Sequence, residues 1–206
     1  MKSVRLSDQD RARLRRSHDA LAARAVAHKA AHGEDNDFEA LTALADWALS
    51  APVAVIDMEE ALRPFGGMEA QMCDRTPPAV AYFMGHRKEI DGLFGRPMTN
   101  LIVKTPVGVL HQLVSGMMPA GQVITTLMTD DDDGTDFLSS VHLDTSGPKV
   151  DIRSAVYNLS SGEQLPMSEE EVYENTGRLL GVYMAAANFI HRVAVEICEA
   201  ESGTVH

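Results

Sequence analysis

The chain has few of the residues that build a disulfide scaffold or a rigid aromatic core. It contains two cysteines, Cys73 and Cys198, in 206 residues, and neither belongs to a C-x-x-C pair. This usage predicts a reduced, cytoplasmic setting and no paired-cysteine zinc site. One Trp and four Tyr stand against eleven Met, which is typical of a soft, adaptable interior or interface.

The sequence also lacks the short motifs that usually reveal an enzyme. There is no Walker loop, no dinucleotide-binding glycine fingerprint and no Gly-x-Ser-x-Gly elbow. His28 and His32 stand four residues apart, but no acidic third ligand follows at helical spacing, so we expect no metal site and no cofactor. The absence of these motifs favours a non-enzymatic role.

Long uninterrupted apolar runs are missing as well. Residues 105–129 hold no Asp, Glu, Lys or Arg, but Pro106, Gly108, Gly116, Pro119 and Gly121 divide the segment. This pattern predicts buried strands with their connections rather than a membrane span. The first residues show neither an apolar core nor a cleavage site, so we expect no signal peptide and no membrane partner.

What the chain does have is a break in charge near residue 33. The first 33 residues hold eight Lys and Arg against three Asp, a net charge of +5. Residues 34–206 hold 10 basic and 27 acidic side chains, a net charge of −17. We therefore divide the chain into a basic helical arm, residues 1–33, and a single acidic α+β domain, residues 34–206.

The arm is predicted to be a helix from Asp8 to His32 with a thin apolar stripe that suits a partner helix. Ser7 and Asp10 resemble a capping box, and Gly33 ends the helix. Four arginines concentrate positive charge near its start: Arg11, Arg13, Arg15 and Arg16. We favour an acidic protein partner, including another copy of the chain, over nucleic acid, because no aromatic-interleaved basic patch accompanies them.

An acidic run offers a candidate receiver for that arm. Asp130, Asp131, Asp132 and Asp133 precede Gly134. An EF-hand alignment puts Ser140 at the twelfth position, where calcium requires a bidentate carboxylate, so the run does not match a calcium loop. A solvated turn is the simplest interpretation, and a weak divalent-ion site, a phosphate mimic or a docking surface are the alternatives.

The predicted fold is α+β. N-terminal helices lead to an antiparallel sheet of about five strands, and a long C-terminal helix packs on the sheet. A short strand is expected at 52–56, a helical turn or two at 58–63, and one helix from Pro78 to Phe94. The sheet strands are expected at 101–104, 109–114, 122–128, 137–144 and 149–159. Ser168 and Glu171 form a capping box for a final helix of roughly thirty residues. The element order also permits a helix-grip-like arrangement around an apolar cavity.

The last two strands predict a hairpin with a specific register. A loop at 145–148 would place His142 opposite Asp151 and Ser140 opposite Arg153, with apolar pairs on the other face. Polar groups on this face, together with two histidines elsewhere, could edge a pocket between the sheet and the last helix. The candidate pocket residues are His111, His142, Asp151, Arg153 and His191.

On the last helix, Gly177, Gly181 and Ala185 form a row of small residues. Such a row permits close approach of another helix or of the sheet, and a dimer contact and an intramolecular contact are equally compatible with it.

Three functions remain open at this level. The first is a non-enzymatic, self-associating interaction or regulatory protein that uses the arm and the acidic body. The second is a small-molecule-binding protein or enzyme with a pocket between sheet and C-terminal helix. The third is a protein that binds nucleic acid through its arginines, or mimics it with its acidic surface.

Overall fold

The computed structural model describes residues 4–50, 52, 54–94, 99–118, 121–129, 136–144 and 151–202, and gives only the backbone for part of the strands. The helices are α1 (Asp8–His32), α2 (Asn36–Ala48), α3 (Met58–Leu62), α4 (Gly67–Gln71), α5 (Pro78–Gly85), α6 (Arg87–Phe94) and α7 (Glu169–Ser202). A 3-10 turn, η1, spans Arg63–Phe65. The strands are β1 (Ala54–Asp57), β2 (Thr99–Lys104), β3 (Leu110–Met118), β4 (Gly121–Thr129), β5 (Asp136–Asp144) and β6 (Asp151–Asn158). The mixed α and β class and the long C-terminal helix are confirmed.

The strands form one sheet in sequence order, β1 to β6. This differs from the expected sheet of about five antiparallel strands, because β1 adds a sixth strand that pairs with β2 in parallel. The remaining neighbours pair antiparallel, as the short connections between them require. Four helices stand between β1 and β2, which is the long crossover that a parallel pair needs.

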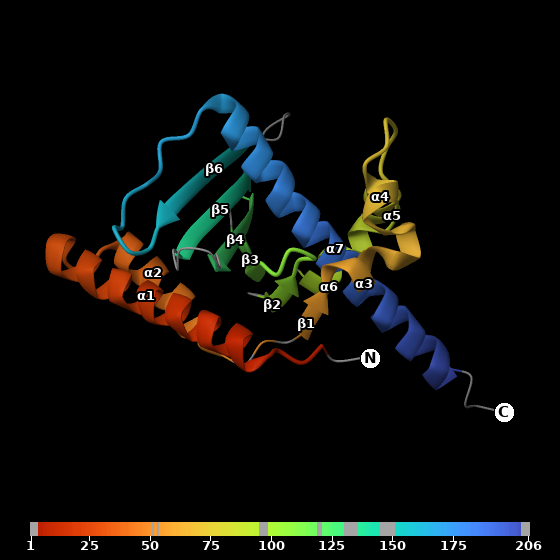
Figure 1. The fold of residues 1–206 in the computed structure, drawn as a ribbon, viewed down its shortest axis with the longest axis horizontal. Helices are drawn as coiled ribbons and strands as arrows, with labels where there is room; N and C mark the ends of the chain where they lie inside the picture. Colours follow the sequence, from red (N-terminus) through yellow and green to blue (C-terminus); the bar gives the residue numbers. More distant parts are fainter. Residues whose placement is uncertain are drawn as a thin grey trace.

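Helices cover both faces of the sheet (Figure 1). On one face, Leu101, Val103 and Leu113 pack with Val182 and the alanines of α7. On the other face, Ile102 and Leu110 pack with Leu14 of α1, while Leu138 packs with Leu21 and α2. Side chains alternate across a strand, so Leu101 and Ile102 serve opposite layers. The centre of the sheet is therefore buried on both sides.

The thin apolar stripe of α1 packs against α2 and the sheet of the same chain. Leu21 is fully buried, and Leu14 and Ala25 are each 6% exposed. The capping box predicted at its start is present: Ser7 Oγ accepts from the Asp10 amide at 3.0 Å, and the Ser7 amide donates to Asp10 Oδ2 at 3.1 Å. Gly33 ends the helix at a φ of 83°. The first helix is thus packed against the body from Asp10 to Ala25.

Buried amides attach α2 to the sheet. Gln112 and Asn100 are each 1% exposed although both are polar. Gln112 Nε2 donates to the Ala48 carbonyl at 2.9 Å and to Asn100 Oδ1 at 2.8 Å, and Asn100 Nδ2 donates to the Trp47 carbonyl at 3.1 Å. These bonds satisfy carbonyls at the end of α2 that the helix itself leaves unpaired.

The hairpin of β5 and β6 keeps the predicted faces but not the predicted register. His142 pairs with Arg153 rather than Asp151, and Asp144 pairs with Asp151 rather than Lys149. The ladder is shifted by two residues from the expected one, because the strands end at Asp144 and resume at Asp151 rather than at Lys149. A shift of two preserves the side-chain face, whereas a shift of one would invert it.

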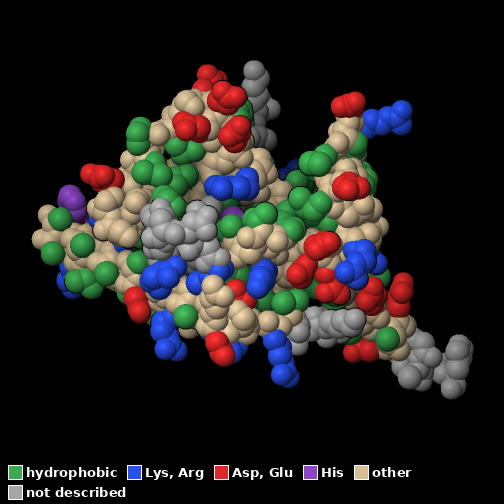
Figure 2. Space-filling model, in the orientation of Figure 1, with side chains coloured by type: hydrophobic (Ala, Val, Ile, Leu, Met, Phe, Trp, Pro, Cys, Tyr) green, Lys and Arg blue, Asp and Glu red, His purple; other side chains and the backbone are tan. Residues whose placement is uncertain are grey.

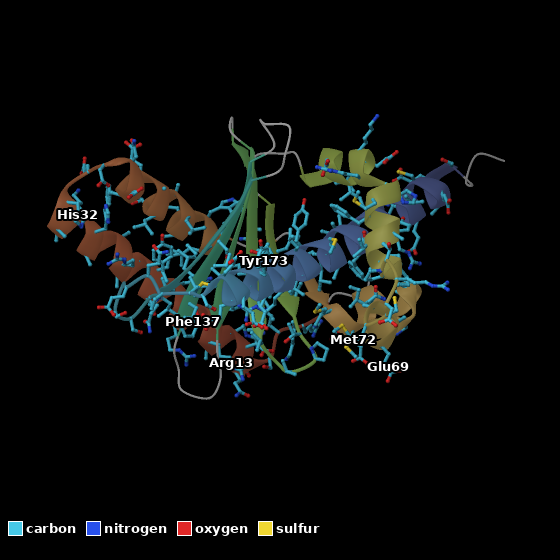
Figure 3. All side chains as sticks on the ribbon, turned by 90° about the horizontal axis from the view of Figure 1, so that it is seen from above. Arg13, His32, Glu69, Met72, Phe137 and Tyr173 are labelled. Atoms are coloured by element: carbon cyan, nitrogen blue, oxygen red, sulfur yellow. The ribbon has the colours of Figure 1, made fainter. Side chains whose placement is uncertain are left out.

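The helix expected from Pro78 to Phe94 is two helices. α5 ends at Gly85, and the His86 amide bonds back to the Tyr82 carbonyl at 3.1 Å and to the Phe83 carbonyl at 3.3 Å. Gly85 is a poor helix former, so the chain turns there at little cost. Figure 3 shows His32 at one end of the molecule, far from Glu69 of α4 and from Met72, which follows α4.

Candidate functional site

The four arginines of α1 do not share one environment. Arg15 and Arg16 are exposed, and Arg11 is exposed while it pairs with Asp8 and donates to the Leu6 carbonyl at 2.6 Å. Arg13 is 8% exposed and donates to the Gly108 carbonyl at 3.0 Å. Arg13 therefore helps to hold α1 against the body, whereas Arg11, Arg15 and Arg16 lie on the outward face of the helix.

Arg13 is part of a buried charged cluster between α1 and β2. Asp10 is 3% exposed and accepts from Lys104 Nζ at 2.9 Å, with Arg13 Nη1 at 3.9 Å from its other oxygen. Burial pulls the pKa of Asp10 upward, but the hydrogen bonds from Lys104 and Ser7 outweigh it and leave the pKa below its usual value. Asp10 is therefore held ionised inside the structure.

Several sequence-predicted residues lie where side chains are not described. Asp130, Asp131, Asp132 and Asp133 fall outside the described residues. His142, Asp151 and Arg153 have a described backbone, on the β5–β6 ladder given above, but their side chains are likewise outside the description.

His111 lies on the face of β3 that is turned to α7, and it is 2% exposed. Its Nδ1 is buried and has no hydrogen-bond partner among the described residues. Burial, with a smaller contribution from the positive charge of Arg178, lowers the pKa of His111 to about 4. The imidazole is therefore neutral at physiological pH.

His191 lies near the other end of α7 and touches two aromatic side chains of α5 and its cap. Tyr82 Oη lies 2.8 Å from His191 Nδ1, and the rings of His86 and His191 are 5.2 Å apart. Burial and the neighbouring His86 lower the pKa of His191, while Glu89 acts in the opposite direction. The structure thus does not bring His111 and His191 into one pocket.

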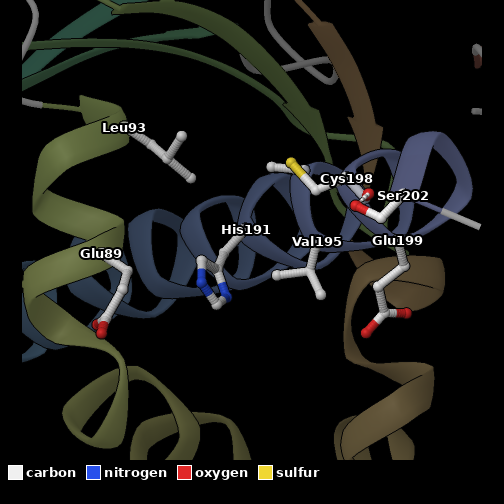
Figure 4. Close-up of a pocket in the computed structure, with 8 residues that line it drawn as sticks. Glu89, Leu93, His191, Val195, Cys198, Glu199 and Ser202 are labelled. Carbon is white, nitrogen blue, oxygen red and sulfur yellow. Dashed lines mark hydrogen bonds between the residues drawn. The ribbon is translucent and has the colours of Figure 1, made fainter. Parts of the chain in front are cut away.

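His191 lies in a groove between α6 and the last turns of α7. The groove has a volume of about 410 Å³ and is walled by Leu93, Ala194 and Val195, with Glu89 and Glu199 at its rim. Figure 4 shows Glu89 and Leu93 on one helix facing His191 and Val195 on the other. Cys198, a free and exposed thiol, also lines it.

The end of α7 lines this groove on one side and is exposed to solvent. Its last eight residues, 195–202, are all exposed, and Figure 1 shows this end running past the other helices. Val195 retains 40% and Ile197 52% of their full exposure. Ile197 continues the helical spacing of apolar residues along α7, yet it is not packed against the body.

The same end carries acidic groups where a helix least favours them. Glu196 and Glu199 lie near the C-terminus of α7, and the last turn has no basic residue. The C-terminus is the negative end of the helix dipole, so the Glu199 carboxylate is unfavourable there, whereas Glu196 is paired with Arg192, whose Nη2 lies 3.9 Å from Glu196 Oε1. This is the signal in the sequence by which the exposed end could have been found.

Comparisons with known proteins do not assign the chain to a family. No family model, curated protein or solved structure matches it. In the described part of the chain, no three His, Cys, Asp or Glu side chains gather as a metal site would require. None of the described helices combines the length and the apolar character needed to cross a membrane.

The row of small residues on α7 is open at two of its three positions. A Cβ at Gly177 or Gly181 would meet no atom within 4 Å, whereas Ala185 is fully buried.

We expect Gly177→Ala to stabilise the protein by about 1 kcal/mol, because glycine is the poorer helix former. Chemical denaturation measures the change. Gly108→Ala is the control, since Gly108 has a φ of 85° and alanine there should destabilise. Weaker self-association of Gly177→Ala would instead place a second helix on this row.

Proposed function

We propose that the protein is a non-enzymatic interaction protein that self-associates. The observation that carries the proposal is the uncovered end of α7, residues 195–202, which combines exposed apolar side chains with acidic ones. Exposed apolar surface with a polar rim is typical of protein-binding sites. The absence of enzyme motifs from the sequence supports the non-enzymatic part.

A second copy of this chain offers a complementary surface. Arg11, Arg15 and Arg16 lie on the outward face of α1. Figure 2 shows Lys and Arg gathered along the lower edge, over the region of α1, and Asp and Glu gathered beyond them at the lower right. Opposite charges favour docking of the basic face of one copy on the acidic end of another. We name these two surfaces the arginine face (Arg11, Arg15, Arg16) and the α7 end (residues 195–202).

The relative positions of the two surfaces favour a closed dimer. The start of α1 and the C-terminal end of α7 both lie at the lower side of the view in Figure 1, so a two-fold axis can set each against the other's complement in one interface. The apolar side chains of the α7 end, Val195 and Ile197, are then removed from water together with the charges. A closed pair uses each surface once and leaves no repeating contact that would grow a filament.

Charge reversal tests the pairing. We expect Arg11→Glu with Arg15→Glu to weaken dimerisation at least tenfold at low salt, because attraction across the interface becomes repulsion. Sedimentation velocity over a concentration series measures the dissociation constant. Arg75→Glu is the matched control, since Arg75 is exposed in the segment between α4 and α5. Adding Glu196→Arg and Glu199→Arg to the reversed variant should restore the dimer. High salt should weaken the native dimer, since it screens exposed charges.

The two cysteines provide an independent readout. Cys198 lies in the α7 end and Cys73 lies in the segment before α5, and both are free and exposed. Self-association should slow the reaction of Cys198 with a thiol reagent at high protein concentration and leave Cys73 unchanged. Equal rates for Cys198 at all concentrations, with a monomer in sedimentation, would contradict the proposal. Binding of labelled DNA or RNA that is lost in the arginine variants would move the assignment to nucleic acid.

A further inference from the structure

A second groove lies at the opposite half of α7, away from the surfaces used above. It has a volume of about 310 Å³, which is at the small end of the roughly 300–1,000 Å³ that ligand pockets occupy. One wall is apolar and is built by Val156 of β6 with Leu165, Pro166 and Met167, which lead into α7. The other wall is the polar face of the first turns of α7.

A fixed network of hydrogen bonds holds an arginine in that polar wall. Asn175 is 5% exposed, and its Oδ1 accepts from Arg178 Nη2 at 2.7 Å and from Ser139 Oγ at 3.1 Å. Asn175 Nδ2 donates to Ser154 Oγ at 2.6 Å. Both ends of the amide are thus tied to the sheet, and Asn175 positions the guanidinium.

The guanidinium of Arg178 has N–H donors that no described hydrogen bond uses. Arginine carries five N–H donors, and a described hydrogen bond uses one of them on a neutral amide oxygen. Arg178 belongs to none of the ion pairs formed by the described residues. Arg178 is exposed at the surface of the groove, yet neighbouring protein atoms partly desolvate it and lower its pKa. An accessible guanidinium that no carboxylate among the described residues neutralises can bind an anion.

Two carboxylates line the same groove and constrain what the anion can be. Glu171 is occupied by the helix cap, where its Oε2 accepts from the Ser168 amide at 2.7 Å and from Ser168 Oγ at 2.8 Å. Glu174 lines the groove one helical turn before Arg178, a spacing that favours a salt bridge, yet the pair is not among the described ion pairs. A simple anion at Arg178 would sit beside the negative charge of Glu174. A zwitterion would satisfy both.

We propose that this groove binds a free α-amino acid with an apolar side chain. Arg178 receives the carboxylate through its unused donors, and Glu174 receives the ammonium. The apolar wall of Val156, Leu165, Pro166 and Met167 covers the side chain. Asn175 is a positioning residue, because it fixes Arg178 without needing to touch the ligand.

Calorimetric titration with three related probes tests the chemistry. L-Leucine carries both charges, 4-methylpentanoate carries the carboxylate alone, and isopentylamine carries the ammonium alone. We expect leucine to bind, and each single-charge probe to bind at least tenfold more weakly. Equal binding of leucine and 4-methylpentanoate would overturn the amino-acid assignment, and no binding of any probe at millimolar concentration would overturn the site.

Substitutions separate the two charge contacts. Arg178→Gln should lower leucine affinity at least tenfold, and Arg178→Lys should recover only part of it because the forked geometry is lost. Glu174→Gln should weaken leucine binding but strengthen binding of 4-methylpentanoate, since a competing negative charge is removed. Arg75→Gln and Glu170→Gln are the matched controls. Glu170 is exposed one turn before Glu174 on α7 and is not among the residues that line the groove. Far-UV circular dichroism verifies that each variant is folded.

His111 supplies a readout that does not depend on heat of binding. The charge of Arg178 helps to keep the pKa of His111 low. A bound carboxylate offsets that charge, so leucine should raise the pKa of His111, measured from its imidazole proton resonances over a pH series. The shift should vanish in Arg178→Gln. If leucine bound equally well to the native protein and to Arg178→Gln and left the pKa of His111 unchanged, its site would lie elsewhere.

Discussion

Lowering the pH from 7 to 4 is expected to remove about 3 kcal/mol of folding free energy through His111 alone. In the folded protein, burial and then the charge of Arg178 lower the pKa of this imidazole to about 4, against 6.5 in the unfolded chain. The unfolded state therefore binds more protons than the folded state between these values, and stability falls as the pH falls through that window. The difference of about 2.5 units corresponds to about 3 kcal/mol, at about 1.4 kcal/mol per unit.

The measurement is the free energy of unfolding by urea as a function of pH. His111→Gln removes the titrating group, so its stability curve should be flatter than that of the native protein between pH 6.5 and 4. His191→Gln is the comparison, because the pKa of His191 is also lowered and His191 contributes in the same direction. Parallel curves for His111→Gln and the native protein would show that the imidazole is already hydrated in the folded state.

Replacing Asp10 with alanine is expected to cost about 3 kcal/mol at neutral pH. The substitution leaves Lys104 and Arg13 without their carboxylate, and removing one partner of a buried pair costs roughly 3–5 kcal/mol. We expect the lower end because the Lys104 side chain retains 34% of its exposure. Asp8→Ala is the matched control, since Asp8 lies in the same first turn with a side chain that is 98% exposed. Chemical denaturation at pH 7 should separate the two variants clearly.

The Asp10 contribution has its own pH window. The pKa of Asp10 is below 3.8 in the folded state, so its stabilisation is fully present above 3.8 and is lost as the pH falls through the lower folded value. This window lies below that of His111, so the two groups titrate in succession during acid unfolding. A native-like stability for Asp10→Ala would show that α1 is held on the sheet by its apolar contacts alone.

The buried contacts of α1 decide which substitutions can test its role in association. Deleting residues 1–33 would remove Leu14, Leu21 and the Asp10 cluster from the core along with the arginines. Loss of association after such a deletion could not be separated from loss of folding. Point reversals at Arg11 and Arg15 leave those contacts in place, which is why the dimer experiment relies on them.

The sequence by itself determined the features that depend on neighbours along the chain. Ser7 with Asp10 and Ser168 with Glu171 form the predicted capping boxes, because a cap is closed by residues three positions apart. The alternation of apolar residues located the strands, although their ends differ by up to a few residues. The charge break at residue 33 is also a property of the sequence, and it stands unchanged.

The tertiary structure decided everything that depends on which faces meet. It turned Arg13 inward and left Arg15 outward on one helix, and it buried the polar side chains of Gln112 and His111 on both faces of one strand. It shifted the β5–β6 ladder by two residues, since the local pattern is the same in both registers. It set Arg178 beside a buried amide rather than a carboxylate. Burial and charge pairing arise between segments far apart in the sequence, so no local pattern contains them.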